Sequence, residues 1–403
     1  MPEPVIVATA RTPIGRAFKG TMVDFRPDDL SATIVRAVLA KVPQLDPAEI
    51  DDVMLGCGLP GGEQGYNMAR VVSILAGLPD IPGTTVTRYC SSSLQTIRMA
   101  SHAIKAGEGD AFLAAGVEMV SRFVKGNSDS LPDTANPRFE EARERAAGRA
   151  QGGAESWKPA DGLPDVYIAM GQTAENVAEL ENVSREDMDA FAKLSQDRAV
   201  NSQENGFFER EITPVTRPDG TEVSKDDGPR PGTTLEKLAA LQPAFRPDGK
   251  VTAGNSCPLN DGAAAVVVMS DTRAAELGIR PLARIISSGV TALNPEIMGL
   301  GPIEASRQAL RRAGMTIDDI DLVEINEAFA AQVVPSARAL GVDWDKLNVN
   351  GGAIALGHPF GMTGARIMTT LLNGLEDADK TIGLETMCVG GGQGMAMVVE
   401  RLN

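Results

Sequence analysis

Cys90 stands at a predicted junction between a strand and a helix. Residues 84–89 are rich in β-branched side chains and predict an extended segment, whereas residues 91–104 predict a helix. A thiol at this junction lies near the positive end of the helix dipole, which lowers its pKa, and near backbone N–H groups that can stabilise an oxyanion. Cys90 is therefore a candidate nucleophile, with a small, buried structural cysteine as the alternative.

Two further candidates lie in glycine-rich segments. His358 is followed by a proline within residues 350–364, where glycines allow the backbone to approach a ligand closely, so a functional imidazole is favoured over a structural one. Cys388 precedes the glycine run 390–392, which suggests thiol chemistry within reach of free backbone N–H groups. The run would also suit a phosphate loop, but the Lys-Ser/Thr that such a loop needs is missing.

Asn326 follows a predicted buried strand and begins the sequence Asn-Glu-Ala-Phe-Ala. Its amide could orient a water molecule or a carbonyl group. On sequence grounds it could equally be the cap of a helix. Both interpretations stay open at this point.

An internal duplication predicts the elements that position these residues. Residues 49–56 resemble residues 319–326, and each copy follows an amphipathic helix, over 30–41 and 302–313 respectively. Apolar strands that begin at 110–113 and 379–382 are separated by nearly the same offset, as are Cys90 and His358. Two halves of similar order, each mixing strands and helices, predict an α/β protein built from a pseudo-twofold repeat.

Residues 122–250 differ in character from both halves. Residues 125–165 are rich in Gly, Pro and charged residues, and they predict a long irregular segment. A helix is then predicted from Ser184, whose capping partner is Asp187, to the stop at residues 205–206. The apolar face of this helix consists of Met188, Phe191 and Leu194. We interpret 122–250 as a loop domain that covers one face of the core, with disorder as the alternative. The N-terminal half then comprises 1–121 plus 251–273, and the C-terminal half comprises 274–403.

The composition excludes several classes of protein. The chain of 403 residues carries 38 basic and 54 acidic side chains, a formal charge of −16, which argues against non-specific nucleic-acid binding. Its longest apolar run, 263–269, is far too short to span a membrane, and no charged-then-apolar leader opens the sequence. We therefore expect a cytoplasmic protein. The four cysteines lie far apart without metal-ligand spacing, which predicts no metal site.

Four motifs together resemble the thiolase family, and the resemblance covers essentially the whole chain. They are the Cys90 junction, Asn-Glu-Ala-Phe-Ala at 326–330, Gly-Gly-Ala-Ile-Ala-Leu-Gly-His-Pro at 351–359 and Cys-Val-Gly-Gly-Gly at 388–392. The resemblance implies an α/β fold with a five-layered αβαβα core from two duplicated halves and an inserted loop domain. It also implies a homotetramer, or at least a homodimer.

The resemblance assigns a role to each candidate. Cys90 would be the nucleophile that carries the acyl group, His358 its activator, and Cys388 the acid and base at the substrate α-carbon. Asn326 would hold a water molecule that forms one oxyanion hole with His358. The backbone N–H groups of Cys90 and Gly390 would form the other.

The resemblance also implies contacts with coenzyme A and the acyl group. The implied substrate-binding residues are Arg230, Ala253, Cys257, Met170 and Phe329. Arg230 would pack at the adenine end, Ala253 along the pantetheine, and Met170 near the acyl pocket. Cys257 stands where a serine is usual, and Ala169 where short-chain enzymes carry a histidine. The second replacement leaves room for longer or bulkier acyl chains.

The implied reaction is thiolytic cleavage of a 3-ketoacyl-CoA to acetyl-CoA and a shortened acyl-CoA, or the reverse condensation of two acetyl-CoA molecules. Coenzyme A is a substrate, and no metal or redox cofactor is implied. The expected setting is fatty acid metabolism and β-oxidation, in which a partner subunit is possible.

The alternatives are a catalytically silent CoA- or lipid-binding relative and a structural subunit of a β-oxidation complex. Such proteins would have no reason to retain Cys90, His358 and Cys388 together. A ketoacyl synthase is disfavoured because His102, on the same predicted helix as Cys90, cannot easily provide a second imidazole.

The charge of the chain bears on the binding of anionic CoA. Within the acidic chain, residues 217–250 are locally neutral, with six basic and six acidic side chains, and Arg230 lies near their centre. On this basis we expect added salt to raise the affinity for CoA or leave it unchanged, because salt screens long-range repulsion.

Overall fold

Two sets of strands with the same order build the core. The computed structural model describes residues 2–129, 131–153 and 156–402. The N-terminal set comprises β4 (Gly83–Val86), β3 (Asp52–Cys57), β5 (Ala111–Met119), β8 (Asn260–Ser270) and β1 (Pro4–Arg11), in spatial order. The C-terminal set comprises β10 (Leu322–Ile325), β11 (Ile382–Val389), β12 (Gln393–Arg401) and β9 (Ala283–Ala292).

The pairing of the strands confirms the duplication. β3 pairs with β5, and β10 with β11, in parallel; β5–β8–β1 and β11–β12–β9 are antiparallel ladders. Even the loop contacts repeat: the Asp51 carboxylate accepts N–H bonds at the start of β5, and the Asp321 carboxylate does so at the start of β11. A short antiparallel contact between β1 and β9 joins the two sets into one sheet.

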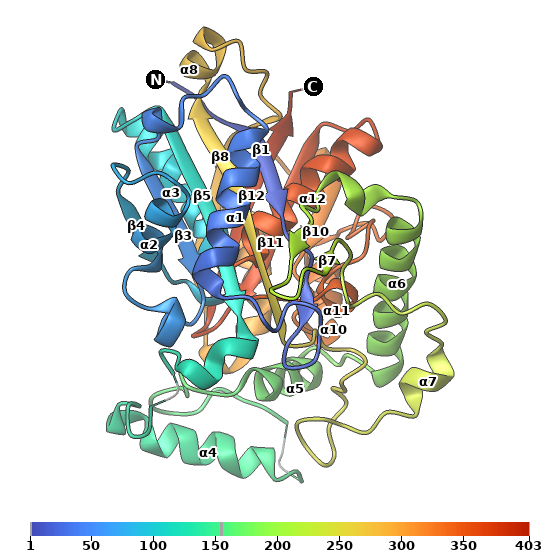
Figure 1. The fold of residues 1–403 in the computed structure, drawn as a ribbon. Helices are drawn as coiled ribbons and strands as arrows, with labels where there is room; N and C mark the ends of the chain where they lie inside the picture. The colour runs from blue at the N-terminus through green and yellow to red at the C-terminus, as the bar shows by residue number, and fades with distance from the viewer. Residues whose placement is uncertain (1, 130, 154–155, 403) are drawn as a thin grey trace.

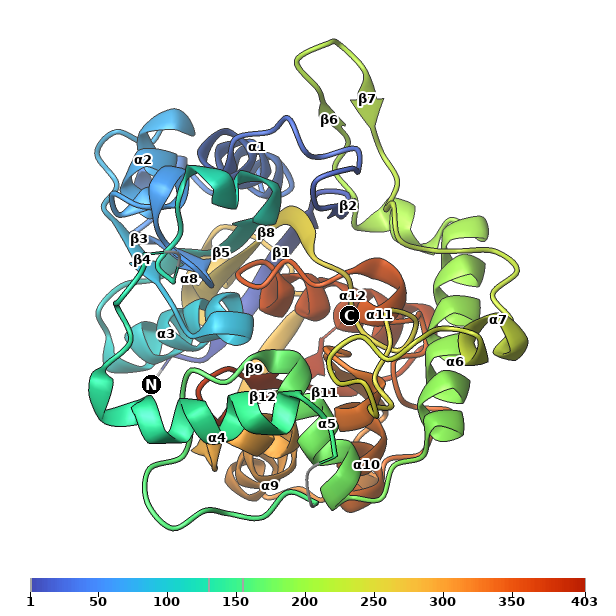
Figure 2. The ribbon, with the colours of Figure 1, turned by 90° about the horizontal axis from the view of Figure 1, so that it is seen from below.

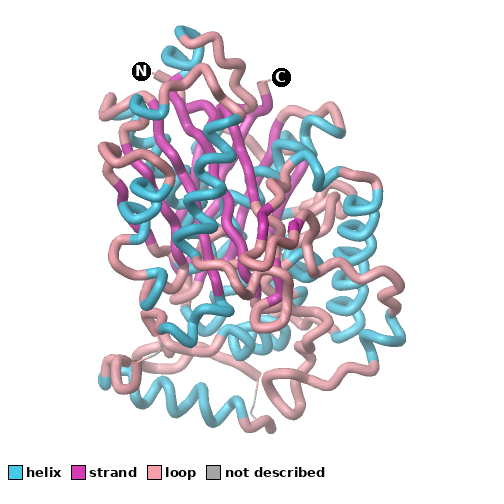
Figure 3. Tube along the Cα trace, in the orientation of Figure 1, coloured by secondary structure: helices cyan, strands magenta, loops and turns pink. Residues whose placement is uncertain are grey.

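Helices complete five layers; Figures 1 and 3 view them face-on, and Figure 2 shows them stacked edge-on. Helices α1 (Pro27–Ala40) and α2 (Met68–Leu75) cover the outer face of the N-terminal set, and α9 (Gly301–Ala313) and α10 (Ala330–Leu340) that of the C-terminal set. Helices α3 (Ser92–Ala106) and α12 (Thr363–Asp377) lie between the sets and contact each other. Gly364 permits this contact, because a Cβ atom there would lie 2.3 Å from the backbone nitrogen of Leu94. The expected αβαβα core is confirmed.

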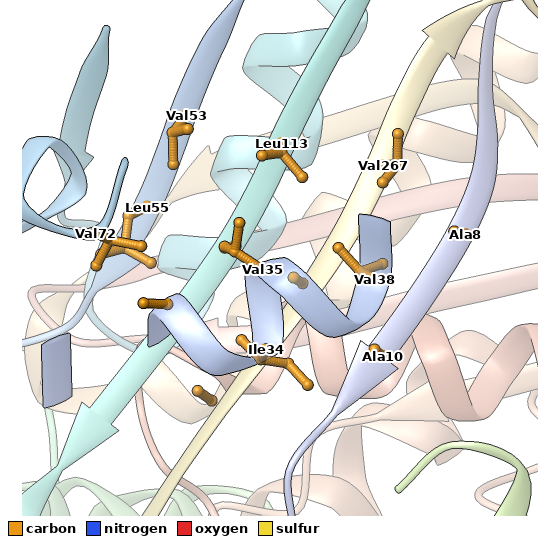
Figure 4. Close-up of a cluster of buried hydrophobic side chains, with 14 of the residues drawn as sticks. Ala8, Ala10, Ile34, Val35, Val38, Val53, Leu55, Val72, Leu113 and Val267 are labelled. Carbon is orange, nitrogen blue, oxygen red and sulfur yellow. The ribbon is translucent and has the colours of Figure 1, made fainter. Parts of the chain in front are cut away.

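Apolar periodicity explains the packing of these layers. Ile34, Val35 and Val38 lie on one face of α1 and are fully buried. Figure 4 shows them against side chains from successive strands, namely Ala8, Ala10, Val53, Leu55, Leu113 and Val267. The strands alternate their side chains, so their opposite faces pack against α3 and α12.

The segment 122–250 forms helices α4 (Glu140–Ala150), α5 (Met170–Leu180), α6 (Arg185–Glu204) and α7 (Leu235–Ala239), and the hairpin β6–β7 (Val215–Thr216 and Glu222–Val223). Figure 1 shows α4 and α5 below the sheets, and Figure 2 shows the hairpin projecting from the core. The Ser184 hydroxyl accepts the N–H of Asp187, as the capping pattern predicts.

The expectation that 125–165 is irregular is wrong for α4. This helix is mostly exposed and gains its stability from Ala, Glu and Arg residues, including the Glu141–Arg145 ion pair, so it lacks an apolar stripe. Residues 130 and 154–155 of this segment lie outside the described residues. The remaining short elements are β2 (Gly15–Arg16), α8 (Asp271–Glu276) and α11 (Ala353–Leu356). None of the helices in the described ranges is long and apolar enough to cross a membrane.

Candidate active site

Cys90 lies on a strained turn between β4 and α3. The strand ends at Val86, earlier than the sequence suggests, and Tyr89–Ser91 form a short 3-10 turn that leads into the helix. Tyr89 has a φ of 43°, a left-handed conformation that costs energy for a bulky residue and is often found at functional sites. This turn places the Cys90 thiol at the N-terminal end of α3, as predicted.

The environment of the Cys90 thiol holds it in the neutral form. Burial raises its pKa to about 12, although the backbone N–H groups of Gly390 and of Cys90 itself point at the sulfur and oppose the rise. The two N–H groups that the sequence assigned to an oxyanion hole therefore converge on the candidate nucleophile. Since the resting group is a thiol, a base must accept its proton during the reaction.

His358 is a neutral imidazole with a defined tautomer. Its Nδ1 lies 2.6 Å from Oγ1 of Thr363, and that hydroxyl donates to the carbonyl oxygen of Pro359 at 2.9 Å. Because the hydroxyl proton is used there, Nδ1–H donates to Thr363 and Nε2 carries the lone pair. Burial and the positive charge of Arg366 lower the pKa of His358 to about 3. Nε2 is thus available as a proton acceptor at neutral pH.

Asn326 lies beside this imidazole, in the connection between β10 and α10. Its Nδ2 is 3.4 Å from Nε2 of His358, and its Oδ1 is buried without a hydrogen-bond partner. The interpretation of Asn326 as a helix cap is wrong, because α10 begins only at Ala330 with Phe329 at the N-cap. An amide oxygen buried without a partner is suited to accept a hydrogen bond from a bound water molecule.

Cys388 is fully buried and lies within β11, one residue before the strand ends. Burial raises the pKa of its thiol, and the neighbouring Cys90 and Cys257 thiols raise it further. The structure therefore gathers three sulfur atoms from β11, the β4–α3 turn and the segment before β8. The fourth cysteine, Cys57, is buried beside Glu118.

Two buried carboxylates, which the sequence analysis missed, support the catalytic loops. Glu118 accepts the backbone N–H groups of Gly58 at 2.7 Å and of Gly361, near His358, at 2.9 Å. Glu327, next to Asn326, accepts the Ser195 hydroxyl and two N–H groups, the Asn348 amide and the backbone N–H of Ile354. A lone acid in an otherwise apolar strand, as at Glu118, is the signal that could have identified it.

A cavity of about 580 Å³, here called the cationic cavity, is lined by three basic side chains: Arg16, Arg230 and Lys237. No acidic side chain is among the described residues that line it. Nε of Arg16 has no hydrogen-bond partner among the residues that the structure describes. Burial lowers the pKa of Arg230, and the positive charge of Arg16 lowers it further, so the two guanidinium groups are neighbours. Adjacent guanidinium groups without a counter-ion are suited to phosphate.

Three other predicted binding residues relate to this cavity. Ala253 and Cys257 line it, as expected. Phe329 does not: it is buried behind Phe245, a lining residue, with the two rings edge-to-face at 5.9 Å. Arg16, which no motif marks, is the lining residue that sequence reasoning missed.

A second cavity of about 660 Å³, here called the thiol cavity, opens onto Cys90. Its walls combine apolar and aromatic side chains, including Met170, Ala169, Tyr89 and Phe360, with the charged Asp129, Asp133 and Arg143. Met170 thus lines the same cavity as Cys90, the candidate nucleophile. Among the described residues, no group of three His, Cys, Asp or Glu side chains could hold a metal ion.

Comparison with known proteins identifies the family. The family model for the N-terminal domain of thiolases matches residues 4–272, and that for the C-terminal domain matches residues 279–401. The chain belongs to the thiolase family. This thiolase is 43% identical over 414 aligned positions to a 3-ketoacyl-CoA thiolase of Bacillus subtilis, covering 99% of this chain and 100% of the relative.

Two further relatives extend the comparison. A 3-oxoadipyl-CoA/3-oxo-5,6-dehydrosuberyl-CoA thiolase of Escherichia coli is 44% identical, with both chains covered fully. The crystal structure of the Bacillus anthracis acetyl-CoA acetyltransferase superposes with a TM-score of 0.86 at 37% identity, covering 100% of this chain and 99% of that one. The activity of this protein is accordingly that of a thiolase, acyl transfer between a cysteine thioester and CoA.

Proposed function

We propose that this thiolase cleaves 3-ketoacyl-CoA substrates whose acyl group is larger than acetoacetyl. The observation that carries this proposal is the size of the thiol cavity, about 660 Å³ next to Cys90, with the small Ala169 in its wall. Cavities of several hundred cubic ångströms hold drug-sized groups, far larger than an acetyl group. Condensation of two acetyl-CoA molecules would use the same residues in reverse.

In the first half-reaction, Nε2 of His358 takes the proton of Cys90, and the thiolate attacks the 3-keto carbon. The N–H groups of Cys90 and Gly390 stabilise the oxyanion that forms, since both already point at the sulfur. The bond between C2 and C3 then breaks, and its electron pair passes to an enolate of acetyl-CoA. The enolate oxygen is stabilised by His358 and by a water molecule on Asn326, and the Cys388 thiol protonates C2.

In the second half-reaction, the Cys388 thiolate takes the proton of the CoA thiol, and the CoA sulfur attacks the thioester on Cys90. Collapse of the tetrahedral intermediate releases the shortened acyl-CoA, and the proton on His358 returns to the departing Cys90 sulfur. Every proton taken up in the first half-reaction is thus accounted for in the second. The nucleotide of CoA would lie in the cationic cavity, against Arg16 and Arg230.

The test is thiolysis of a series from acetoacetyl-CoA to long-chain and ring-bearing 3-ketoacyl-CoA. The series includes 3-oxoadipyl-CoA, because Arg143 lines the thiol cavity and the Escherichia coli relative is named for that substrate. We expect kcat/KM to rise from acetoacetyl-CoA to larger substrates. A preference for acetoacetyl-CoA over all larger substrates would refute the proposal on substrate size.

Covalent catalysis is tested separately. Incubation with a 3-ketoacyl-CoA should add one acyl group per chain, detected by intact mass spectrometry, and Cys90→Ser should abolish it. Normal turnover by Cys90→Ser would refute the assignment of the nucleophile.

We further propose a cytoplasmic homodimer or homotetramer that serves fatty acid metabolism and β-oxidation. Large apolar side chains are exposed around α2 and at the start of the loop domain, namely Tyr66, Ile74, Leu75 and Val124. Exposed apolar side chains of this size favour contact with a second copy of the chain. Sedimentation of the wild type and of a Tyr66→Asp/Val124→Asp variant tests this: the variant should be monomeric, and a monomeric wild type would contradict the proposal.

A further inference from the structure

Three buried charged side chains lie beneath the catalytic loops of the C-terminal half. They are Glu324 in β10, Glu385 in β11 and Arg366 in α12, here called the buried triad. Glu324 and Glu385 face each other in the parallel ladder between β10 and β11. Each lies just ahead of a candidate catalytic residue, Asn326 and Cys388 respectively, while Arg366 follows His358 in the first turn of α12.

The triad is buried but not directly paired. The side chains are at most 3% exposed, and none forms an ion pair or hydrogen bond with another residue that the structure describes. Nη1 of Arg366 and both carboxyl oxygens of Glu385 are buried without a partner. Buried polar groups in folded proteins are almost always satisfied, and internal water molecules satisfy those that lack a protein partner. The triad therefore marks a position for bridging water.

The charges of the triad do not balance. It contains one base and two acids, and the nearby Arg11 is already paired with Glu211 and Asp226. The charged groups that affect the pKa of Glu385 are Arg366 of α12 and Glu324 of β10. The pKa of Glu324 is affected by Arg366 and also by Glu327, Glu211 and Arg198. An uncompensated carboxylate is very costly to bury, so a proton is the expected neutralising partner.

The two carboxyl groups, Glu324 and Glu385, differ in pKa and so in how readily they lose that proton. Burial raises the pKa of Glu324 to about 8, with the charge of Arg366 opposing the rise. Burial raises the pKa of Glu385 well above its ordinary value, and Glu324 adds to the rise. Glu324 therefore loses its proton first, near pH 8, and becomes the counter-ion of Arg366 as the pH rises, whereas Glu385 stays the neutral acid.

We propose that Glu385 stores one proton in a water-bridged Arg366–Glu324–Glu385 cluster that positions Asn326, Cys388 and His358 for the enolate step. These three are positioning residues, because none of them lines either cavity. The proposal rests on the proposed function for its catalytic consequence, but its proton content is a property of the folded protein alone. Loss of the proton at alkaline pH would place a second negative charge beside Glu324, which lies on β10 two residues before Asn326, and close to Arg366, whose charge already acts on His358.

The first experiment compares two isosteric variants, Glu385→Gln and Glu324→Gln. Glutamine mimics a neutral acid, so Glu385→Gln should exchange the methyl protons of acetyl-CoA with deuterated water at the wild-type rate at pH 7. Glu324→Gln cannot provide the anion that Glu324 offers Arg366 once it ionises, so the exchange should slow roughly ten- to hundredfold above about pH 8, through misplaced catalytic groups, and much less at pH 7. Glu376→Gln, on the exposed face of α12, is the matched control and should have no effect.

The second experiment measures thermal unfolding against pH. Between the ordinary Glu pKa of about 4.3 and the raised value in the folded protein, the folded state binds more protons than the unfolded state. Wild-type stability should therefore fall as pH rises through this window, and Glu385→Gln should remove that component. The gain in Tm of Glu385→Gln over the wild type should grow from pH 5 to pH 8. The alkaline loss of proton exchange should also move to higher pH in this variant.

Either of two results would overturn the proposal. Parallel Tm-against-pH curves for the wild type and Glu385→Gln would show that Glu385 carries no additional proton. A tenfold or greater loss of exchange in Glu385→Gln at pH 7 would show that the residue acts as an anion. If Glu324→Gln fails to fold, the Glu385→Gln results decide alone. The unfolding curves involve no catalytic measurement, so their outcome is separate from that of the proposed function.

Discussion

Removal of the guanidinium group of Arg16 or Arg230 should weaken the binding of CoA without changing the chemistry. Methionine in place of either arginine retains the apolar stem and removes the charge. A hydrogen bond to a charged group contributes about 1.5–3 kcal/mol, and the lower end applies because both side chains are partly open to solvent. A loss of about 1.5 kcal/mol corresponds to about a tenfold rise in the KM for CoA. Because the phosphates are remote from the reacting carbon, kcat should be unchanged.

The assay compares full-length CoA substrates with acyl-pantetheine substrates, which lack the nucleotide. The rise in KM for Arg16→Met and Arg230→Met should disappear with the truncated substrates, because the lost contact is with phosphate. Arg210→Met is the matched control, since Arg210 pairs with Asp377 and lies outside the lining of the cationic cavity. An equal effect on full-length and truncated substrates would refute the placement of the nucleotide.

Salt dependence provides an independent check of the cationic cavity. The composition of residues 217–250 led us to expect that salt leaves the CoA affinity unchanged or raises it. The structure changes this expectation in two ways. Asp226 is paired with Arg11, and Arg16 of the N-terminal half lines the cationic cavity together with Arg230, so the cavity is basic and not neutral. We now expect KM for CoA to rise between about 0.01 M and 0.15 M salt, as the screening length falls from about 30 Å to about 8 Å. A KM that is flat or falls with salt would argue against the cavity as the nucleotide site.

Three further predictions concern the catalytic centre. The Cys388→Ser variant should still acylate Cys90 in a single turnover. Its exchange of the acetyl-CoA methyl protons should slow by two to four orders of magnitude, because a serine hydroxyl is a far weaker base. Exchange at the wild-type rate, measured by NMR, would exclude Cys388 as the base. The Ala169→Phe variant should have a kcat/KM for long or ring-bearing substrates that is lower by roughly 5- to 100-fold, which corresponds to about 1–3 kcal/mol of overpacking. Its kcat/KM for acetoacetyl-CoA should be unchanged. Equal losses on the large substrates and on acetoacetyl-CoA would place the acyl group elsewhere. The rate of single-turnover acylation of Cys90, measured against pH, should show no inflection near pH 6.5. Burial and the charge of Arg366 lower the pKa of His358 to about 3, so its imidazole stays neutral in this range. An inflection near pH 6.5 would contradict this environment of His358.

The parts of the fold that sequence could predict are those with local or repeated signals. The helix predicted at 30–41 is α1 at Pro27–Ala40, because its apolar periodicity and its burial coincide. The cap at Ser184 was predictable because it involves neighbours in sequence. The duplication was predictable because both halves must bury similar strands in the same order.

What sequence could not predict depends on contacts between distant residues. Arg16 belongs to no motif and joins the cationic cavity only because β2 pairs with the first residues of β8, in the second segment of the N-terminal half. The role of Glu118 depends on Gly361, which lies in the other half. The catalytic motifs were recognisable as motifs, but the tautomer of His358 follows only from the position of the Thr363 hydroxyl.

The presence of two separate cavities has a consequence for the order of steady-state events. Cys90 opens into the thiol cavity, whereas the basic side chains line the cationic cavity. An acyl group on Cys90 therefore occupies space that CoA does not need, so one CoA product can leave and the next CoA can enter while the acyl group stays in place. Initial rates should follow a ping-pong pattern, with parallel double-reciprocal lines for 3-ketoacyl-CoA and CoA. Excess CoA should inhibit competitively against the 3-ketoacyl-CoA, because both place the same nucleotide in the cationic cavity of the free enzyme.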